Sequence, residues 1–180
     1  MKKIKLYFAS PLFTVMEQWF NRDVVEELRN QIGFLPKSEQ VDISIYLPQE
    51  NEAINDKSAY ANSTMIAQAD TQELLESDIV LAILDGVTVD AGVASEIGVA
   101  YAKGIPVIGL YSDSRQGTHG NVKKVEALDE IAESQFAYIN LYTAGLVKLN
   151  GVITGNITDF VDTILEDVKK LIEDKLEEVE

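Results

Sequence analysis

Short apolar runs bounded by turn residues recur along the 180 residues of the chain, with amphipathic segments between them. The first run alternates apolar residues with others at every second position, the period of a strand with one face toward a core. This period places Tyr7 on the face opposite Leu6. Later runs are almost continuously apolar, which is typical of parallel strands covered on both sides. The expected strands are residues 3–10, 41–48, 77–86, 105–113 and a short final strand at 136–142.

The segments between these runs carry apolar residues at helical spacing. Residues 15–33 are expected to form a helix that stops at Gly33, and residues 158–180 a strongly amphipathic one. The apolar face of the first helix consists of Trp19, Phe20, Val24, Leu28 and Ile32. The apolar face of the last consists of Val161, Ile164, Leu165, Val168, Leu171 and Ile172.

Two further helices are expected, one over residues 59–76 and one from about Ala91 to Gly104. Residues 114–135 are polar and are expected to form a loop with room for one helix. Strands that alternate with helices in this way predict a single α/β domain over residues 1–180. The expected architecture is a doubly wound, flavodoxin-like or Rossmann-like parallel sheet of about five strands with helices on both faces. Ligands of such sheets bind beyond the carboxyl ends of the strands.

Composition narrows the classes of function. Thirty acidic and fifteen basic residues give a net charge of -15, which repels phosphate backbones and anionic lipids. We therefore expect neither nucleic-acid polymers nor membranes as partners. The chain has no cysteine, which excludes thiol catalysis and thiolate metal sites and suits a reducing compartment, so we expect a cytoplasmic protein. The single histidine, His119, is expected in a surface loop, and neither a histidine-based metal site nor a Ser-His-Asp triad is expected.

A single carboxylate, Glu96, lies within the otherwise small and apolar stretch "AGVASEIGVAYAKGIPVIGLY". A buried ionised group is unfavourable unless something compensates it. The amino terminus of the helix that begins near Ala91 supplies positive potential, and glycine and alanine neighbours let a ligand approach closely. These features suit a carboxylate at the floor of a cleft. Helical geometry alone favours the competing interpretation, a glutamate facing solvent, because charged residues are mostly exposed.

Three segments, "LYFASPLFT", "AQADTQELLESDIVLAILDG" and "DAGVASEIGVAYAKGIPVIGLY", occur in an order and spacing that resemble the nucleoside 2-deoxyribosyltransferase family. Weaker similarity extends from residue 3 to about residue 156. The resemblance implies that Glu96 is the nucleophile that attacks the anomeric carbon of a 2-deoxyribonucleoside. It also implies that Tyr7 orients this carboxylate and that Asp70 protonates the departing base. Taken alone, Tyr7 could equally be a core strand tyrosine, and Asp70 an ordinary helix-end acid.

The same resemblance implies the residues that bind substrate. Asp90 would hold the 5′-hydroxyl of the sugar, although its position also fits a helix cap. Asn140 and Tyr142 lie in a segment that resembles one lent by a neighbouring subunit, which implies a homo-oligomer with shared active sites. Phe13 and Gln49, which follow the first two expected strands, are positioned to pack on a base and to hydrogen-bond one.

The activity implied is transfer of a 2-deoxyribosyl group between nucleobases, through a covalent ester on a glutamate and with retention, without a metal or organic cofactor. One alternative is hydrolysis of a 2-deoxynucleoside or its 5′-monophosphate. A phosphate is disfavoured because "ASPLFTVMEQ" carries no basic residue before Arg22 and Asp90 would repel it. A second alternative is a nucleoside-binding sensor without turnover. Base preference and the number of subunits stay open.

Overall fold

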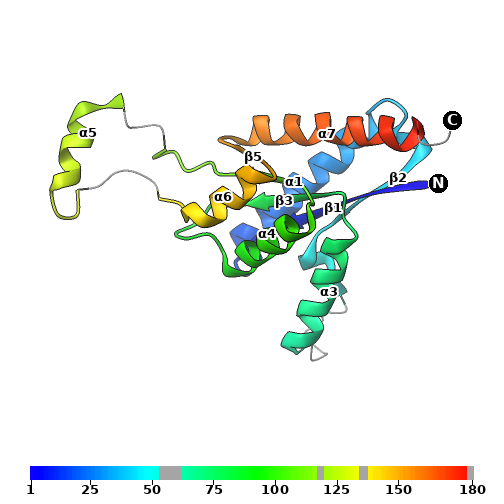
Figure 1. Ribbon diagram of the computed structural model, residues 1–180, viewed down its shortest axis with the longest axis horizontal. Coiled ribbons are helices and arrows are strands. Elements are labelled where there is room, and N and C mark those ends of the chain that lie inside the picture. Colours follow the sequence, from blue (N-terminus) through cyan, green and yellow to red (C-terminus); the bar gives the residue numbers. More distant parts are fainter. Residues whose placement is uncertain (53–61, 117–119, 134–137, 178–180) are drawn as a thin grey trace.

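The computed structural model describes residues 1–52, 62–116, 120–133 and 138–177. Five parallel strands form one sheet in the order β2-β1-β3-β4-β5, with helices on both faces (Figure 1). This confirms the predicted doubly wound α/β fold. The strands are β1 (Lys2–Ala9), β2 (Val41–Tyr46), β3 (Ile79–Ile83), β4 (Val107–Leu110) and β5 (Gly151–Thr154). The α-helices are α1 (Val15–Gly33), α3 (Ser63–Leu75), α4 (Ala91–Lys103), α5 (Val122–Glu126), α6 (Leu141–Leu149) and α7 (Ile157–Glu177), and the 3-10 helices are η1 (Ser38–Gln40), η2 (Pro48–Glu50) and η4 (Ala127–Asp129).

Strand β1 is buried on both faces, so it has a core on each side rather than the one that its alternation predicted. Ile4, Leu6 and Phe8 pack against α1 and α7. Tyr7 and Ala9 point to the other face, where α3, α4 and α6 contribute the buried side chains. Tyr7 is thus directed toward α4, and its ring has no solvent exposure.

The chain reverses its direction of winding at β1, because β2 lies on one side of this strand and β3 on the other. In doubly wound sheets this switch point, at the carboxyl edge, is where ligands bind. The loop after β1, helix η2 after β2 and the amino terminus of α4 after β3 all begin at this edge. Helix α4 is held in place at both ends, with Asp90 as its amino-terminal cap and Gly104, at φ 71°, as its left-handed carboxyl-terminal cap.

The predicted final strand is wrong for residues 138–142, and residues 136 and 137 lie outside the described part of the chain. Helix α6 occupies Leu141–Leu149, and the fifth strand follows it at Gly151–Thr154. Asn140 starts the helix, since its side-chain oxygen accepts a hydrogen bond of 3.0 Å from the backbone N–H of Thr143. The apolar residues after it then recur at helical spacing on the buried face. The cap and the helical period outweigh the strand propensity of the short aromatic run.

The apolar face predicted for α1 is right for Val24, Leu28 and Ile32 and wrong for two aromatic residues. Trp19 is 64% exposed and Phe20 is 38% exposed. At about 100° per residue, Trp19 lies on the side of α1 opposite Leu28, and Phe20 lies at the flank of the buried stripe, so neither ring is directed into the core. The side chains of α7 that were predicted to face the core do so, either buried or packed against it.

The other predicted elements lie close to their expected places. Helix α3 spans Ser63–Leu75, and the predicted residues 59–61 lie outside the described part of the chain, as does His119. The polar segment 114–135 contains the short helix α5, which stands away from the rest of the molecule (Figure 1). Within the described residues, no helix is both long and apolar enough to cross a membrane.

Candidate active site

A cavity of about 260 Å³ lies at the switch point, between the loop after β1, helices η2 and α3, and the first half of α4. Three carboxylates face it: Asp70 from α3, Glu96 from α4 and Asp90 from the amino-terminal cap of α4. Four of the predicted site residues contribute to its wall. The lining residues are Ser10, Leu12, Phe13, Pro48, Ile66, Asp70, Asp90, Gly92, Val93 and Glu96.

Glu96 is held by a phenol from the central strand. The Tyr7 hydroxyl donates a hydrogen bond of 2.6 Å to Glu96 Oε1, across 89 residues of sequence. Short hydrogen bonds of this kind are typical of an ionised acceptor. Because the bond fixes Oε1, the carboxylate has one defined orientation, with Oε2 as its second oxygen. The Glu96 side chain is therefore held in place, unlike that of a glutamate that extends into solvent.

Burial dominates the electrostatics of this pair. It raises the pKa of Glu96 from its usual 4.5 to about 7; the negative charges of Asp70 and Asp90 act in the same direction, and the hydrogen bond from Tyr7 opposes the rise. Burial and the charge of Glu96 raise the pKa of Tyr7 far above its usual range. Tyr7 consequently remains a protonated donor at every physiological pH.

Asp70 is also held by a tyrosine, one that the sequence analysis missed. The Tyr46 hydroxyl donates to Asp70 Oδ1 at 3.0 Å and accepts from Asn51 Nδ2 at 2.9 Å. Burial raises the pKa of Asp70, the bond from Tyr46 lowers it, and the charge of Glu73 raises it. The site thus contains two carboxyl groups, each bonded to its own phenol.

The two phenols are in contact. Tyr7 and Tyr46 are partners in the parallel register of β1 and β2, and their rings stack with centroids 5.4 Å apart and an angle of 27° between planes. The available signal in the sequence was the position of Tyr46 at the carboxyl end of the second strand. Tyr46 lies beside Tyr7 because of the register between β1 and β2, which no local sequence pattern predicts.

Asp90 is the cap of α4, as its position suggested, and it also faces the cavity. Its Oδ1 accepts hydrogen bonds from the backbone N–H groups of Gly92 at 2.8 Å and Val93 at 3.1 Å, so it caps α4. It also lines the cavity. A Cβ atom on residue 92 would lie 2.9 Å from Asp90 Oδ1, so glycine at this position lets the carboxylate approach the helix closely.

Two more side chains shape the cavity near the end of β1. Ser10 is buried, and its hydroxyl has no hydrogen-bond partner within the described residues. Buried polar atoms are nearly always paired, so this hydroxyl is suited to meet a ligand atom in the cavity that it lines. The sequence analysis did not select it. Phe13 is 79% exposed and forms part of the cavity wall.

Three predicted residues are not brought to this cavity. Gln49 donates to the carbonyl oxygen of Gln18 and accepts from Asn21, both at 3.0 Å, so its amide is engaged away from the lining. Asn140 caps α6, and Tyr142 on that helix is 77% exposed. In the described parts of the chain, no three or more His, Cys, Asp or Glu side chains lie so that they could hold one metal ion together.

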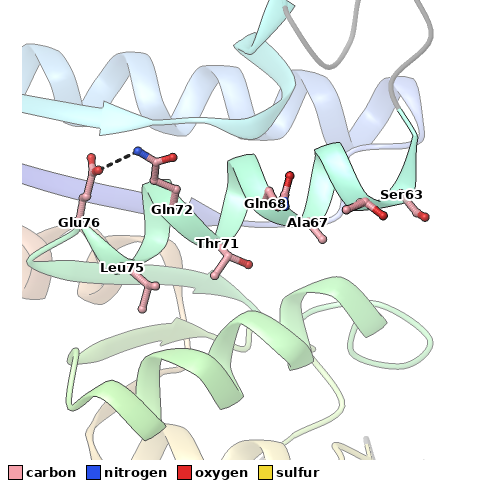
Figure 2. Close-up of a pocket in the computed structure, with 8 residues that line it drawn as sticks. Ser63, Ala67, Gln68, Thr71, Gln72, Leu75 and Glu76 are labelled. Carbon is pink, nitrogen blue, oxygen red and sulfur yellow. Dashed lines mark hydrogen bonds between the residues drawn. The ribbon is translucent and has the colours of Figure 1, made fainter.

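A larger hollow of about 860 Å³ runs along an exposed face of α3, and all of its lining residues belong to this helix or follow it directly (Figure 2). It contains none of the predicted site residues. Its one carboxylate, Glu76, accepts hydrogen bonds from Gln72 and Lys5. We therefore place the candidate active site in the smaller cavity at the switch point, where the carboxylates and the phenols converge.

Comparison with known proteins identifies the family of the chain. The profile of the family described as Nucleoside 2-deoxyribosyltransferase matches residues 6–141. A conserved protein from Enterococcus faecalis V583 has a solved structure that is 54% identical, with a TM-score of 0.80, and the match covers 92% of this chain and 99% of that one. No curated protein matches the chain.

Two solved 2-deoxyribosyltransferases share the fold. The enzyme from Bacillus psychrosaccharolyticus is 19% identical with a TM-score of 0.53, over 86% of this chain and 88% of that one. The enzyme from Leishmania mexicana is 17% identical with a TM-score of 0.58, over 91% of this chain and 97% of that one. The fold and site thus define an α/β protein with a carboxylate-rich cavity at the switch point of its sheet. The chain belongs to the nucleoside 2-deoxyribosyltransferase family.

Proposed function

We propose that this protein transfers the 2-deoxyribosyl group between nucleobases through a covalent ester on Glu96, with retention of configuration. The observation that carries the proposal is the bond between Tyr7 and Glu96 in a cavity that Asp70 also lines. A nucleophilic carboxylate and a separate acid are what cleavage of an N-glycosidic bond requires, because the transition state has oxocarbenium character and the base leaves best when protonated.

The reaction has two displacement steps. With Oε1 held by Tyr7, Oε2 of Glu96 attacks C1′ while the bond from C1′ to the base nitrogen breaks and Asp70 gives its proton to the base. A second base then attacks C1′, the ester bond breaks, and its electrons return to the Glu96 carboxylate while the proton of the incoming base passes to Asp70. Each step inverts C1′, so the net result is retention.

The polar groups of the cavity favour free 2-deoxynucleosides and nucleobases as substrates. Asp90 could accept a hydrogen bond from a 5′-hydroxyl through Oδ2, whereas it would repel a 5′-phosphate. The lining, as far as the structure describes it, contains no lysine or arginine to balance a phosphate. A sugar without a 2′-hydroxyl also forms the cationic transition state more easily. The proposal includes a homo-oligomer with shared sites, in which Tyr142 and Asn140 contact the sugar in the site of a second copy; the exposure of Tyr142 supports this role.

Purified protein incubated with deoxyinosine and free cytosine or adenine should produce the exchanged deoxynucleoside, and chromatography of the mixture would show it. Release of hypoxanthine without an exchanged product would show that the protein is a hydrolase rather than a transferase. If neither deoxynucleosides nor their 5′-monophosphates are consumed, while a deoxynucleoside still binds, the protein would instead be a nucleoside-binding sensor.

The rate of base release should depend on pH through Glu96. Only the ionised carboxylate can attack C1′, and burial raises its pKa to about 7. In the variant Asp70→Asn, which leaves Glu96 as the titrating carboxyl of the pair, we therefore expect kcat/KM to fall about tenfold per pH unit below a pKa near 7, rather than below the ordinary range of a glutamate. Initial rates of this variant measured across the pH range would locate the fall. A rate of this variant that stays constant down to about pH 5 would contradict the assignment of Glu96 as the nucleophile.

A further inference from the structure

Tyr46 does not line the cavity, but it contacts one carboxyl group of the site directly and the other through Tyr7. Its ring stacks on Tyr7, the donor to Glu96, and its hydroxyl donates to Asp70. The residue therefore contacts both halves of the proposed machinery. Its position suits control of how Asp70 is presented to the substrate.

The direction of the hydrogen bonds determines what Tyr46 can do. A phenol has one hydrogen to donate, and an amide nitrogen can only donate. Since Asn51 Nδ2 donates to the Tyr46 oxygen at 2.9 Å, the phenolic hydrogen is available to Asp70 Oδ1 at 3.0 Å. Oδ1 is then occupied as an acceptor. Any proton that Asp70 carries is directed to Oδ2.

We propose that Tyr46, oriented by Asn51, is a positioning residue that makes Oδ2 of Asp70 the proton-donating atom for the leaving base. This inference rests on the proposed function. The ring stack gives Tyr46 a second positioning effect, because a shift of Tyr46 would also move Tyr7, the side chain that orients Glu96. Two carboxylates from α3, Asp70 and Glu73, act on the Tyr46 hydroxyl through their charge. Asn51, which follows η2, is neutral and acts through its hydrogen bond.

The variant Tyr46→Phe tests this proposal, since it keeps the stacked ring and removes the donor. Single-turnover base release should be measured for deoxycytidine and for 5-fluorodeoxycytidine, whose base is a better leaving group. We expect about a tenfold loss for deoxycytidine and a clearly smaller loss for the fluorinated substrate, because an activated base needs its proton less. The limb of the pH profile that Asp70 sets should move to higher pH, since the lost hydrogen bond favours ionised Asp70.

Tyr101→Phe, which removes the hydroxyl of an exposed tyrosine on α4, is the matched control and should behave as the wild type. An unchanged rate, or an equal loss for both substrates with an unmoved pH limb, would overturn the role of Tyr46. Should Tyr46→Phe fail to fold, Asn51→Ala decides, because it should show the same leaving-group dependence at smaller amplitude. If the wild-type protein releases base neither from these two substrates nor from deoxyinosine, the proposed function itself would be refuted.

Discussion

Glu96→Gln is expected to reduce base exchange by about 10⁴-fold or more, the scale seen when a covalent nucleophile is removed. The amide oxygen can still accept the hydrogen bond from Tyr7, so the size and orientation of the side chain are retained. What is lost is the negative charge that attacks C1′. Chromatography of deoxyinosine with adenine would measure the change, with Glu166→Gln, an exposed position on α7, as the matched control.

The same substitution should raise stability above pH 7. The pKa of Glu96 is higher in the folded protein than its usual 4.5, so the folded state binds this proton more tightly than the unfolded state. The wild type therefore loses stability as pH rises from about 4.5 through about 7. The shift to about 7 corresponds to roughly 3 kcal/mol at most. Glu96→Gln removes this loss, and its melting temperature should exceed that of the wild type at pH 8 by more than at pH 5.

Glu96→Ala distinguishes a missing nucleophile from a damaged site. Added azide can enter the space vacated by the carboxylate and attack C1′ while the base leaves. The product should be a 2-deoxyribosyl azide of inverted configuration, because only one displacement takes place. Exchange that survives in either variant would exclude Glu96 as the nucleophile. Loss of exchange without a gain in stability at pH 8 would indicate that the carboxylate is not buried as described.

The sequence predicted the parts of the fold that depend on local pattern. Uninterrupted apolar runs identified β3 and β4, and caps and helical spacing identified α4 and α7. The short aromatic run before α6 was misread because a strand of that length has no more periodic signal than the first turn of a helix. Trp19 and Phe20 were assigned to the wrong face: Trp19 precedes Leu28 by about 2.5 helical turns and so lies on the opposite side of α1, and Phe20 lies at the flank of the buried stripe.

The candidate site was predictable as far as it follows from motifs. Asp70 and Glu96 are brought into one cavity as the family resemblance implied, and Tyr7 bonds to Glu96. Tyr46 was missed because its contacts with Tyr7 and Asp70 depend on strand register and on the placement of α3. Ser10 could not be selected either, since an unpaired hydroxyl becomes unusual only when its burial is known.

Gly151→Ala is expected to be among the most destabilising single substitutions in this protein. Gly151 starts β5 opposite Val107 in β4, and an added Cβ would lie only 1.9 Å from the carbonyl oxygen of Val107. Both atoms belong to or adjoin the backbone, so the strands themselves must separate. The hydrogen bond of 3.1 Å from Val107 N–H to Asn150 would be disturbed as well. We expect a loss of about 3 kcal/mol in the free energy of unfolding, a large share of the total for a single domain.

Gly145→Ala provides the matched control, because it makes the same chemical change within α6, where an added Cβ meets nothing within 4 Å. It should stabilise the protein by about 0.5 to 1 kcal/mol, since alanine is the better helix former. Thermal melting of the two variants should therefore shift in opposite directions. Strands β3 and β4 separate β5 from β1, so the Gly151→Ala protein that remains folded at low temperature should keep the wild-type kcat. A wild-type melting temperature for Gly151→Ala would mean that β4 and β5 do not approach as closely as described.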